Sequence, residues 1–135
     1  MPSMPSMVLF VYGTLRRLAG HPMHASLRAV ASFMGEGRIR GRLYLIDRYP
    51  GLVLDPTADW VVGELYEVRD LAGLAVLDAY EGASPEDPQP HEFRRVRRPV
   101  EQLDGQRCLA WIYEYGWPTE GRVRIPSGDF LRHER

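Results

Sequence analysis

The sequence has a single cysteine, Cys108, and no apolar run long enough to cross a membrane as a helix. With no second cysteine, an internal disulfide is excluded. A transmembrane helix needs about 20 consecutive apolar residues, and no stretch approaches that length. Residues 1–6 have neither a basic segment nor a long apolar one, so they do not resemble a secretory signal and are expected to form a flexible leader. We therefore expect a cytoplasmic protein with no membrane partner.

The sequence also lacks an excess of charge of either sign. The chain carries 17 basic and 18 acidic residues, for a formal net charge of −1. This balance argues against a nucleic-acid or membrane partner held by overall charge. The length of 135 residues fits one domain, which at this size can bury roughly two-thirds of its unfolded surface. We therefore expect residues 7–135 to form a single domain.

Hydrophobic patterns predict six strands and two helices. Apolar runs or apolar–polar alternation indicate strands at 8–12, 38–47, 52–54, 60–68, 92–103 and 106–115. The dipeptide Asp104–Gly105 between the last two strands is typical of a hairpin. Helical spacing is expected within 21–37, ended by Gly35 and Gly37, and over 70–82, with Asp70 and Gly82 as caps.

These elements do not alternate as strand and helix, so a doubly wound parallel sheet is not expected. The pattern predicts an α+β fold: a small mixed, mainly antiparallel sheet of about six strands that curls toward a barrel, with two short flanking helices. Because the strand at 8–12 is apolar throughout, it is expected to be central. Gly13 directly after it permits a sharp turn or a close approach to the backbone.

Two kinds of site receive little support from the sequence. The four histidines show no spacing with cysteine or carboxylate that would suit a metal, so no metal site is predicted. The basic run Arg94–Arg98 suggests a nucleic-acid contact as one hypothesis. On a strand, however, Arg95 and Arg97 face one side while Arg94 and Arg98 flank Val96 on the other. A solvated strand face is therefore the preferred interpretation, since salt-sensitive binding needs several clustered phosphate contacts.

Glu81 stands where the second predicted helix ends, in "LDAYEG". An acid at a helix C-terminus opposes the helix dipole, so it gains nothing from local helix energetics. Two interpretations stay open from the pattern alone. The side chain is either a solvent-exposed acid, or a carboxylate in a partly apolar pocket whose raised pKa suits it to move protons.

Seven segments together resemble a known family. They are "FVYGTLRR", "YPGLV", "VVGELYEV", "LDAYEG", "FRRVRRPV", "AWIYEY" and "IPSGDF". They occur in the order found in the gamma-glutamylcyclotransferase-like family, and the resemblance runs from Val8 to Phe130. It implies a small barrel-like mixed sheet with flanking helices, in agreement with the strand and helix patterns.

The resemblance also implies a site. By position, Tyr12, Gly13, Thr14 and Leu15 would line the substrate pocket, and Glu81 would accept a proton. Residues Tyr49, Gly51 and Tyr115 are candidates for the pocket wall. In "IPSGDF", Ser127 and Asp129 are more simply interpreted as turn residues that bond local backbone.

The reaction implied by the resemblance converts a gamma-glutamyl amine or peptide into 5-oxoproline and free amine. The nucleophile is the substrate's own amino group, so the reaction needs no catalytic serine or cysteine, no metal and no cofactor. It does need a base and hydrogen-bond donors for the carbonyl oxygen. An alternative is a non-catalytic module that binds a small carboxylate metabolite in the same pocket. The oligomeric state stays open.

Overall fold

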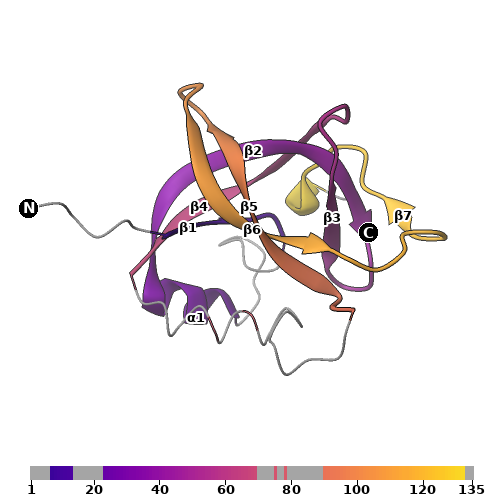
Figure 1. The fold of residues 1–135 in the computed structure, drawn as a ribbon, viewed down its shortest axis with the longest axis horizontal. Helices are drawn as coiled ribbons and strands as arrows, with labels where there is room; N and C mark the ends of the chain where they lie inside the picture. Colours follow the sequence, from indigo (N-terminus) through magenta and orange to yellow (C-terminus); the bar gives the residue numbers. More distant parts are fainter. Residues whose placement is uncertain (1–6, 14–22, 70–74, 76–77, 79–89, 133–135) are drawn as a thin grey trace, which may run out of the picture.

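Within the part of the chain that the structure describes, five strands close into a small barrel, and two further strands and the helix α1 lie outside it (Figure 1). The computed structural model describes residues 7–13, 23–69, 75, 78 and 90–132, so the predicted leader 1–6 lies outside them. The described elements are β1 (Met7–Val11), α1 (Met23–Val30), β2 (Ala31–Leu45), β3 (Pro50–Leu54), β4 (Trp60–Val68), β5 (Phe93–Gln102), β6 (Arg107–Tyr115), β7 (Val123–Arg124) and the 3-10 helix η1 (Phe130–Arg132).

The barrel follows the order β1–β4–β2–β3–β6, and β6 returns to pair with β1. The β1–β6 and β3–β6 pairs are parallel, whereas the other pairs are antiparallel. The prediction of a mixed, mainly antiparallel, barrel-like sheet with a central first strand is therefore confirmed. Strands β5 and β7 lie outside the closed ring, β5 beside β6 and β7 beside the end of β2.

The helix predicted within 21–37 is shorter than expected. It spans only Met23–Val30, and the chain enters β2 at Ala31. Extending it was wrong because residues 31–37 have partners on β4: Phe33 lies opposite Tyr66, with ring centroids 5.6 Å apart. A bulge between Phe33 and Gly35, where Gly35 has φ of 133°, lets the strand bend onward. Tertiary pairing thus overrides the local helical spacing.

The second predicted helix, 70–82, lies largely outside the described residues. Of that range only Ala75 and Asp78 are described, and both are helical. Among the described elements the fold is therefore mostly β, with α1 as its α-helix. The predicted hairpin is confirmed: β5 and β6 pair antiparallel along their length, and the turn places Gly105 at φ of 84°. Ser127 and Asp129 bond local backbone, as expected of a turn.

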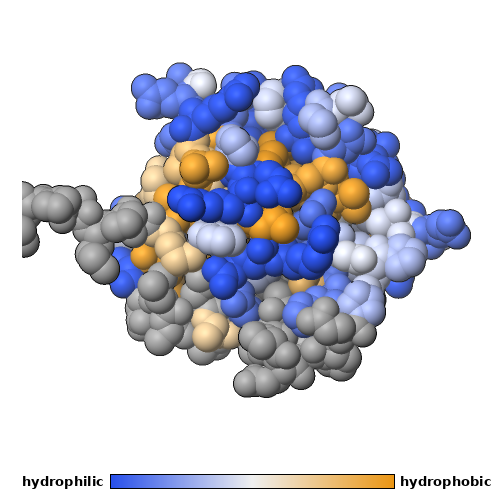
Figure 2. Space-filling model, viewed as in Figure 1, coloured by the Kyte–Doolittle hydropathy of each residue, from blue (hydrophilic) through white to orange (hydrophobic). Residues whose placement is uncertain are grey.

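Side chains alternate between two cores along the barrel strands. One core receives residues from all five barrel strands, among them Phe10, Leu43, Leu52, Leu65 and Ile112, and fills the barrel interior. The other lies on the outer face, where Leu9, Tyr66, Phe93 and Tyr113 pack with Leu27 of α1. On the face in Figure 2, charged side chains separate the apolar areas.

Barrel closure at β6 relies on side chains as well as backbone. The parallel pairings are short, with two register pairs between β1 and β6 and one between β3 and β6. The Tyr12 hydroxyl donates to the Tyr113 carbonyl at 2.5 Å and accepts from the Leu52 amide at 3.2 Å. The Glu114 carboxylate accepts from the Leu54 amide at 2.9 Å. These side chains therefore bridge β1, β3 and β6 where the ladder is sparse.

Replacing Tyr12 by phenylalanine should test this bridge. The variant loses the bond to the Tyr113 carbonyl and leaves the buried Leu52 amide without its acceptor. We expect the free energy of unfolding, measured in urea, to fall by about 1–3 kcal/mol. Tyr44→Phe is the matched control, since among the described residues the half-buried Tyr44 hydroxyl bonds the side chain of the neighbouring Arg42, and it should cost less than about 1 kcal/mol. Equal losses in the two variants would show that Tyr12 does not bridge the closure.

Candidate functional site

The end of β1, the start of β3 and the end of β6 meet at one place, here called the β1–β3–β6 corner (Gly13, Pro50, Gly51 and Tyr115). A Cβ at Gly13 would lie 2.7 Å from the Pro50 Cγ, and a Cβ at Gly51 would lie 2.8 Å from the Tyr115 Cγ. Contacts this close admit only glycine without rearrangement. The structure therefore brings Gly13, Gly51 and Tyr115, three residues predicted for the site, into one packed cluster.

Tyr12 reaches this corner through its backbone rather than its side chain. The side chain packs in the barrel interior, and its hydroxyl bridges β6 and β3. The backbone of Tyr12 and Gly13 leads directly into the predicted substrate loop. Three other predicted site residues, Thr14, Leu15 and Glu81, lie outside the described residues.

Aromatic rings line one side of the corner. Tyr49 and Phe93 have centroids 6.0 Å apart, Phe93 and Tyr115 pack edge to face at 5.4 Å, and Tyr115 and Trp117 follow at 6.5 Å. The Tyr49 hydroxyl donates a short hydrogen bond to the Glu92 carboxylate. Tyr49, a predicted wall residue, is thus joined to Tyr115 through Phe93. Edge-to-face packing of this kind fixes the ring orientations.

The Tyr115 hydroxyl is a buried polar group that makes no hydrogen bond of ordinary geometry to the described residues, although it interacts with the Arg122 guanidinium. Its residue is only 3% exposed. Burial raises the pKa of this hydroxyl, the Arg122 guanidinium opposes the rise, and the Glu92 carboxylate adds to it. A buried hydroxyl normally has a partner, because leaving it unpaired costs free energy. Tyr115 is therefore a polar group at the corner with capacity to bond a ligand.

Two acids near this region, the buried Glu64 and the half-buried Asp78, were not singled out from the sequence. Glu64 lies on β4, opposite Val11 of β1, and is 2% exposed. Its carboxylate accepts a hydrogen bond from the Tyr66 hydroxyl at 2.9 Å. The period of two in "GELYEV" places Glu64 on the same face as Tyr66, which was the available signal. That signal was missed because the segment was interpreted only as a strand.

Asp78 is the second acid. It accepts a hydrogen bond from the Tyr113 hydroxyl at 2.7 Å and forms an ion pair with the Arg95 Nε at 3.0 Å. The Arg95 guanidinium also lies 4.8 Å from the Trp111 ring centre. These contacts fix Asp78 against the outer face of β5 and β6. Sequence alone offered no signal for this pairing, because its partners lie far apart in the chain.

No group of three or more histidine, cysteine, aspartate or glutamate side chains within the described ranges could hold a metal ion. Among the helical residues that the structure describes, none belongs to a helix long and apolar enough to cross a bilayer. The run Arg94–Arg98 lies on a strand, as predicted, since β5 pairs with β6 along this whole run.

Comparison with known proteins points to one family. The family model described as "Gamma-glutamyl cyclotransferase, AIG2-like" matches residues 9–132. The Escherichia coli K12 gamma-glutamylcyclotransferase family protein YtfP is 33% identical over 130 residues, covering 96% of this chain and 100% of YtfP.

Solved structures are similar over nearly the whole chain. A protein of Pyrococcus horikoshii matches with a TM-score of 0.67 and 32% identity, covering 93% of this chain and 90% of that one. The mouse AIG2-like protein matches with a TM-score of 0.64 and 26% identity, covering 93% and 94% of the two chains. The similarity therefore spans both the barrel and the corner.

Tyr49 should make stability depend on alkaline pH. Burial, followed by the hydrogen bond and charge of Glu92, raises its pKa well above the ordinary value of 10.0. The folded state then retains a proton that the unfolded chain releases, so this stabilisation is complete below about pH 10 and is lost as pH rises further. Unfolding in urea at about pH 8 and about pH 10.5 should show a smaller alkaline loss for Tyr49→Phe than for the wild type. The same loss in both proteins would contradict this origin.

Proposed function

The chain belongs to the gamma-glutamyl cyclotransferase, AIG2-like family, and we propose on this basis that it converts a gamma-glutamyl amine or peptide into 5-oxoproline and free amine. The observation that carries the proposal is the family match over residues 9–132, which includes the corner and Glu81. The acceptor of the proton is proposed to be Glu81. Tyr12, Gly13, Thr14 and Leu15 are proposed to bind the substrate, and the cytoplasm is the proposed location.

The proposed reaction is an internal aminolysis. The α-amino nitrogen of the substrate attacks its own γ-carbonyl carbon, forming the ring C–N bond while the original amide C–N bond breaks. Glu81 takes the proton that the attacking nitrogen loses and passes it to the leaving amine. Because the nucleophile belongs to the substrate, the protein has to fold the substrate, move one proton and stabilise the oxyanion.

The loop that follows β1 is proposed to supply the donors. Gly13 packs against Pro50 with no space for a Cβ, which fixes the direction in which the chain leaves the strand. The backbone amides of Thr14 and Leu15 are proposed as donors for the oxyanion or for a substrate carboxylate. Donors that are held in place before the reaction lose little freedom when charge develops, which is the condition for effective oxyanion stabilisation.

The position of Glu81 in the sequence supports this role, because it follows Asp78 by three residues. Asp78 is hydrogen-bonded to Tyr113, two positions before Tyr115 on the same face of β6. Asp78 therefore connects the segment of sequence that contains Glu81 to the strand that ends at the corner. The Tyr115 hydroxyl, which has no hydrogen bond of ordinary geometry to the described residues, is proposed to bond a polar substrate there.

Release of 5-oxoproline from gamma-glutamyl amides, gamma-glutamyl dipeptides and gamma-glutamyl-lysine should test the proposal. We expect turnover of at least one substrate, with Glu81→Gln slowing it by about 10²- to 10⁴-fold, since general acid–base groups contribute on that scale. Glu36→Gln is the control, because Glu36 is an exposed acid on β2 that has no place in the proposed mechanism, and it should keep wild-type turnover.

Two outcomes would overturn parts of this proposal. Turnover that survives in Glu81→Gln would keep the reaction but remove Glu81 as the base. No turnover of any substrate by folded protein, combined with saturable binding of 5-oxoproline or glutamate, would replace the enzyme with a binding module for small carboxylates.

A further inference from the structure

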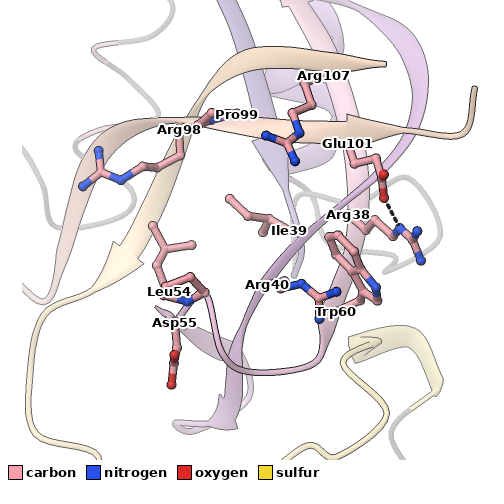
Figure 3. A pocket seen from close by; sticks show the side chains of 11 residues that line it. Arg38, Ile39, Arg40, Leu54, Asp55, Trp60, Arg98, Pro99, Glu101 and Arg107 are labelled. Atoms are coloured by element: carbon pink, nitrogen blue, oxygen red, sulfur yellow. Dashed lines mark hydrogen bonds and ion pairs between the residues drawn. The ribbon is translucent and has the colours of Figure 1, made fainter. Parts of the chain in front are cut away.

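A pocket of about 360 Å³ opens between β2, the β3–β4 connection and the β5–β6 hairpin. Its lining includes Arg40, Leu54, Trp60, Arg98, Pro99 and Arg107, and we call it the arginine pocket (Figure 3). None of the residues that form the β1–β3–β6 corner lines it. On β6 the two places lie at opposite ends, with Arg107 at the first residue and Tyr115 at the last. The arginine pocket is therefore separate from the proposed site of cyclisation.

The charges in the arginine pocket are unbalanced. Its lining holds four arginines and two acids. Glu101 is already paired with Arg38 at 2.6 Å, and Asp55 with Arg42, which lies outside the lining, at 3.6 Å. In the part of the chain that the structure describes, the other three arginines, Arg40, Arg98 and Arg107, have no carboxylate within ion-pair distance. The pocket therefore presents three cationic groups that are not neutralised.

Two of these three arginines are partly held in place by other contacts. The Arg40 Nη1 donates to the Ala58 carbonyl at 3.1 Å, and its guanidinium carbon lies 4.1 Å from the centre of the Trp60 ring. The Arg98 Nη1 donates to the Arg97 carbonyl at 2.8 Å. These contacts engage one nitrogen each and leave further N–H groups for a ligand. A guanidinium stacked on an aromatic ring is also pre-oriented for binding.

The remaining surface of the pocket is apolar. Ile39, Leu54, Pro56 and Pro99 contribute to the wall, and the Trp60 ring closes one end. In Figure 3 the Arg107 guanidinium points toward the space above Ile39, and Arg98 lies at the end away from Trp60. An apolar cavity with a few charged groups, in the size range of small-molecule sites, is the usual form of a ligand pocket.

We propose that the arginine pocket binds a small organic phosphate, with its phosphate on Arg107 and its apolar body on Ile39, Leu54 and Pro99. A phosphomonoester offers two negative charges and three acceptor oxygens, which match the forked donors of arginine. A single carboxylate would leave more of the positive charge unmatched. A nucleic-acid backbone is disfavoured because the net charge is −1 and the unpaired arginines form one pocket rather than a track.

Titration of the ¹⁵N-labelled protein with phenyl phosphate tests this proposal directly. The indole N–H of Trp60, assigned from the Trp60→Phe spectrum, should shift in a saturable way. Phenyl phosphate should bind more tightly than inorganic phosphate, because the apolar wall contacts only the former. Arg107→Gln should weaken binding of phenyl phosphate by about tenfold, in line with loss of a charge-assisted hydrogen bond.

Arg97→Gln is the matched control. It removes the same charge from β5, but Arg97 lies outside the pocket lining, with its guanidinium 5.9 Å from the Trp111 ring centre. Its affinity for phenyl phosphate should stay within about twofold of wild type. The spectra also show whether each variant is folded. The assay measures binding alone, so its result is independent of 5-oxoproline release.

Three results would overturn the proposal. The first is the absence of a saturable shift of the Trp60 signal up to about 10 mM phenyl phosphate, because a specific site would have a lower dissociation constant than this. The second is equal weakening by Arg97→Gln and Arg107→Gln, which would indicate general charge attraction. The third is tighter binding of a single-stranded oligothymidylate than of phenyl phosphate, which would assign the surface to nucleic acid instead.

Discussion

Closure of the barrel at β6 is the constraint on which the rest of this structure depends. The strand joins β1 and β3 in parallel over only three register pairs in total, so backbone pairing there is sparse. Side chains complete the closure. The Tyr12 hydroxyl bonds the backbone of both β6 and β3, and the Glu114 carboxylate accepts from the Leu54 amide. A buried hydrogen bond contributes modestly when made, but its loss leaves an unsatisfied buried group and costs more. The closure is thus specific, because few other side chains could satisfy the same backbone groups.

The same closure determines what the motif residues do. Tyr12 belongs to the motif that we propose binds substrate, yet its side chain bridges β6 and β3 in the barrel, so the proposed binding role falls to the backbone of this motif. Gly13 and Gly51 are required by contacts of 2.7 and 2.8 Å to Pro50 and Tyr115. In the proposed mechanism this motif is structural in its side chains and functional in its backbone. Tyr115 differs, since its ring packs in the core while its hydroxyl makes no hydrogen bond of ordinary geometry to the described residues.

Much of the fold could be predicted because its signals are local. Alternation in the strands, the Asp104–Gly105 hairpin and the apolar first strand each encode a feature that a few neighbouring residues determine. The segment at 31–37 could not be assigned in this way, since Phe33 takes its conformation from Tyr66 on another strand. The candidate site likewise has residues that local motifs indicated and residues that depend on distant contacts. Family motifs indicated Gly13, Gly51 and Tyr115, whereas Asp78 depends on Tyr113 and Arg95, whose separation in sequence hides the contact.

The arginine pocket could not be predicted from the sequence, because its arginines come from three strands and no single segment indicates that they lie together. Its distance from the corner also bears on how the two sites relate. Eight residue steps along β6 separate Arg107 from Tyr115, or about 26 Å at the rise of a strand. The Debye length at physiological ionic strength is only about 8 Å, so exposed arginines at one end scarcely alter the potential at the other. A phosphate in the arginine pocket could therefore influence the proposed cyclisation only mechanically, through β6, the strand that closes the barrel. The hydrogen bonds of Tyr12 and Glu114, which hold β6 against β1 and β3, oppose a shift of this strand, and the physical expectation is two sites that act independently on one small barrel.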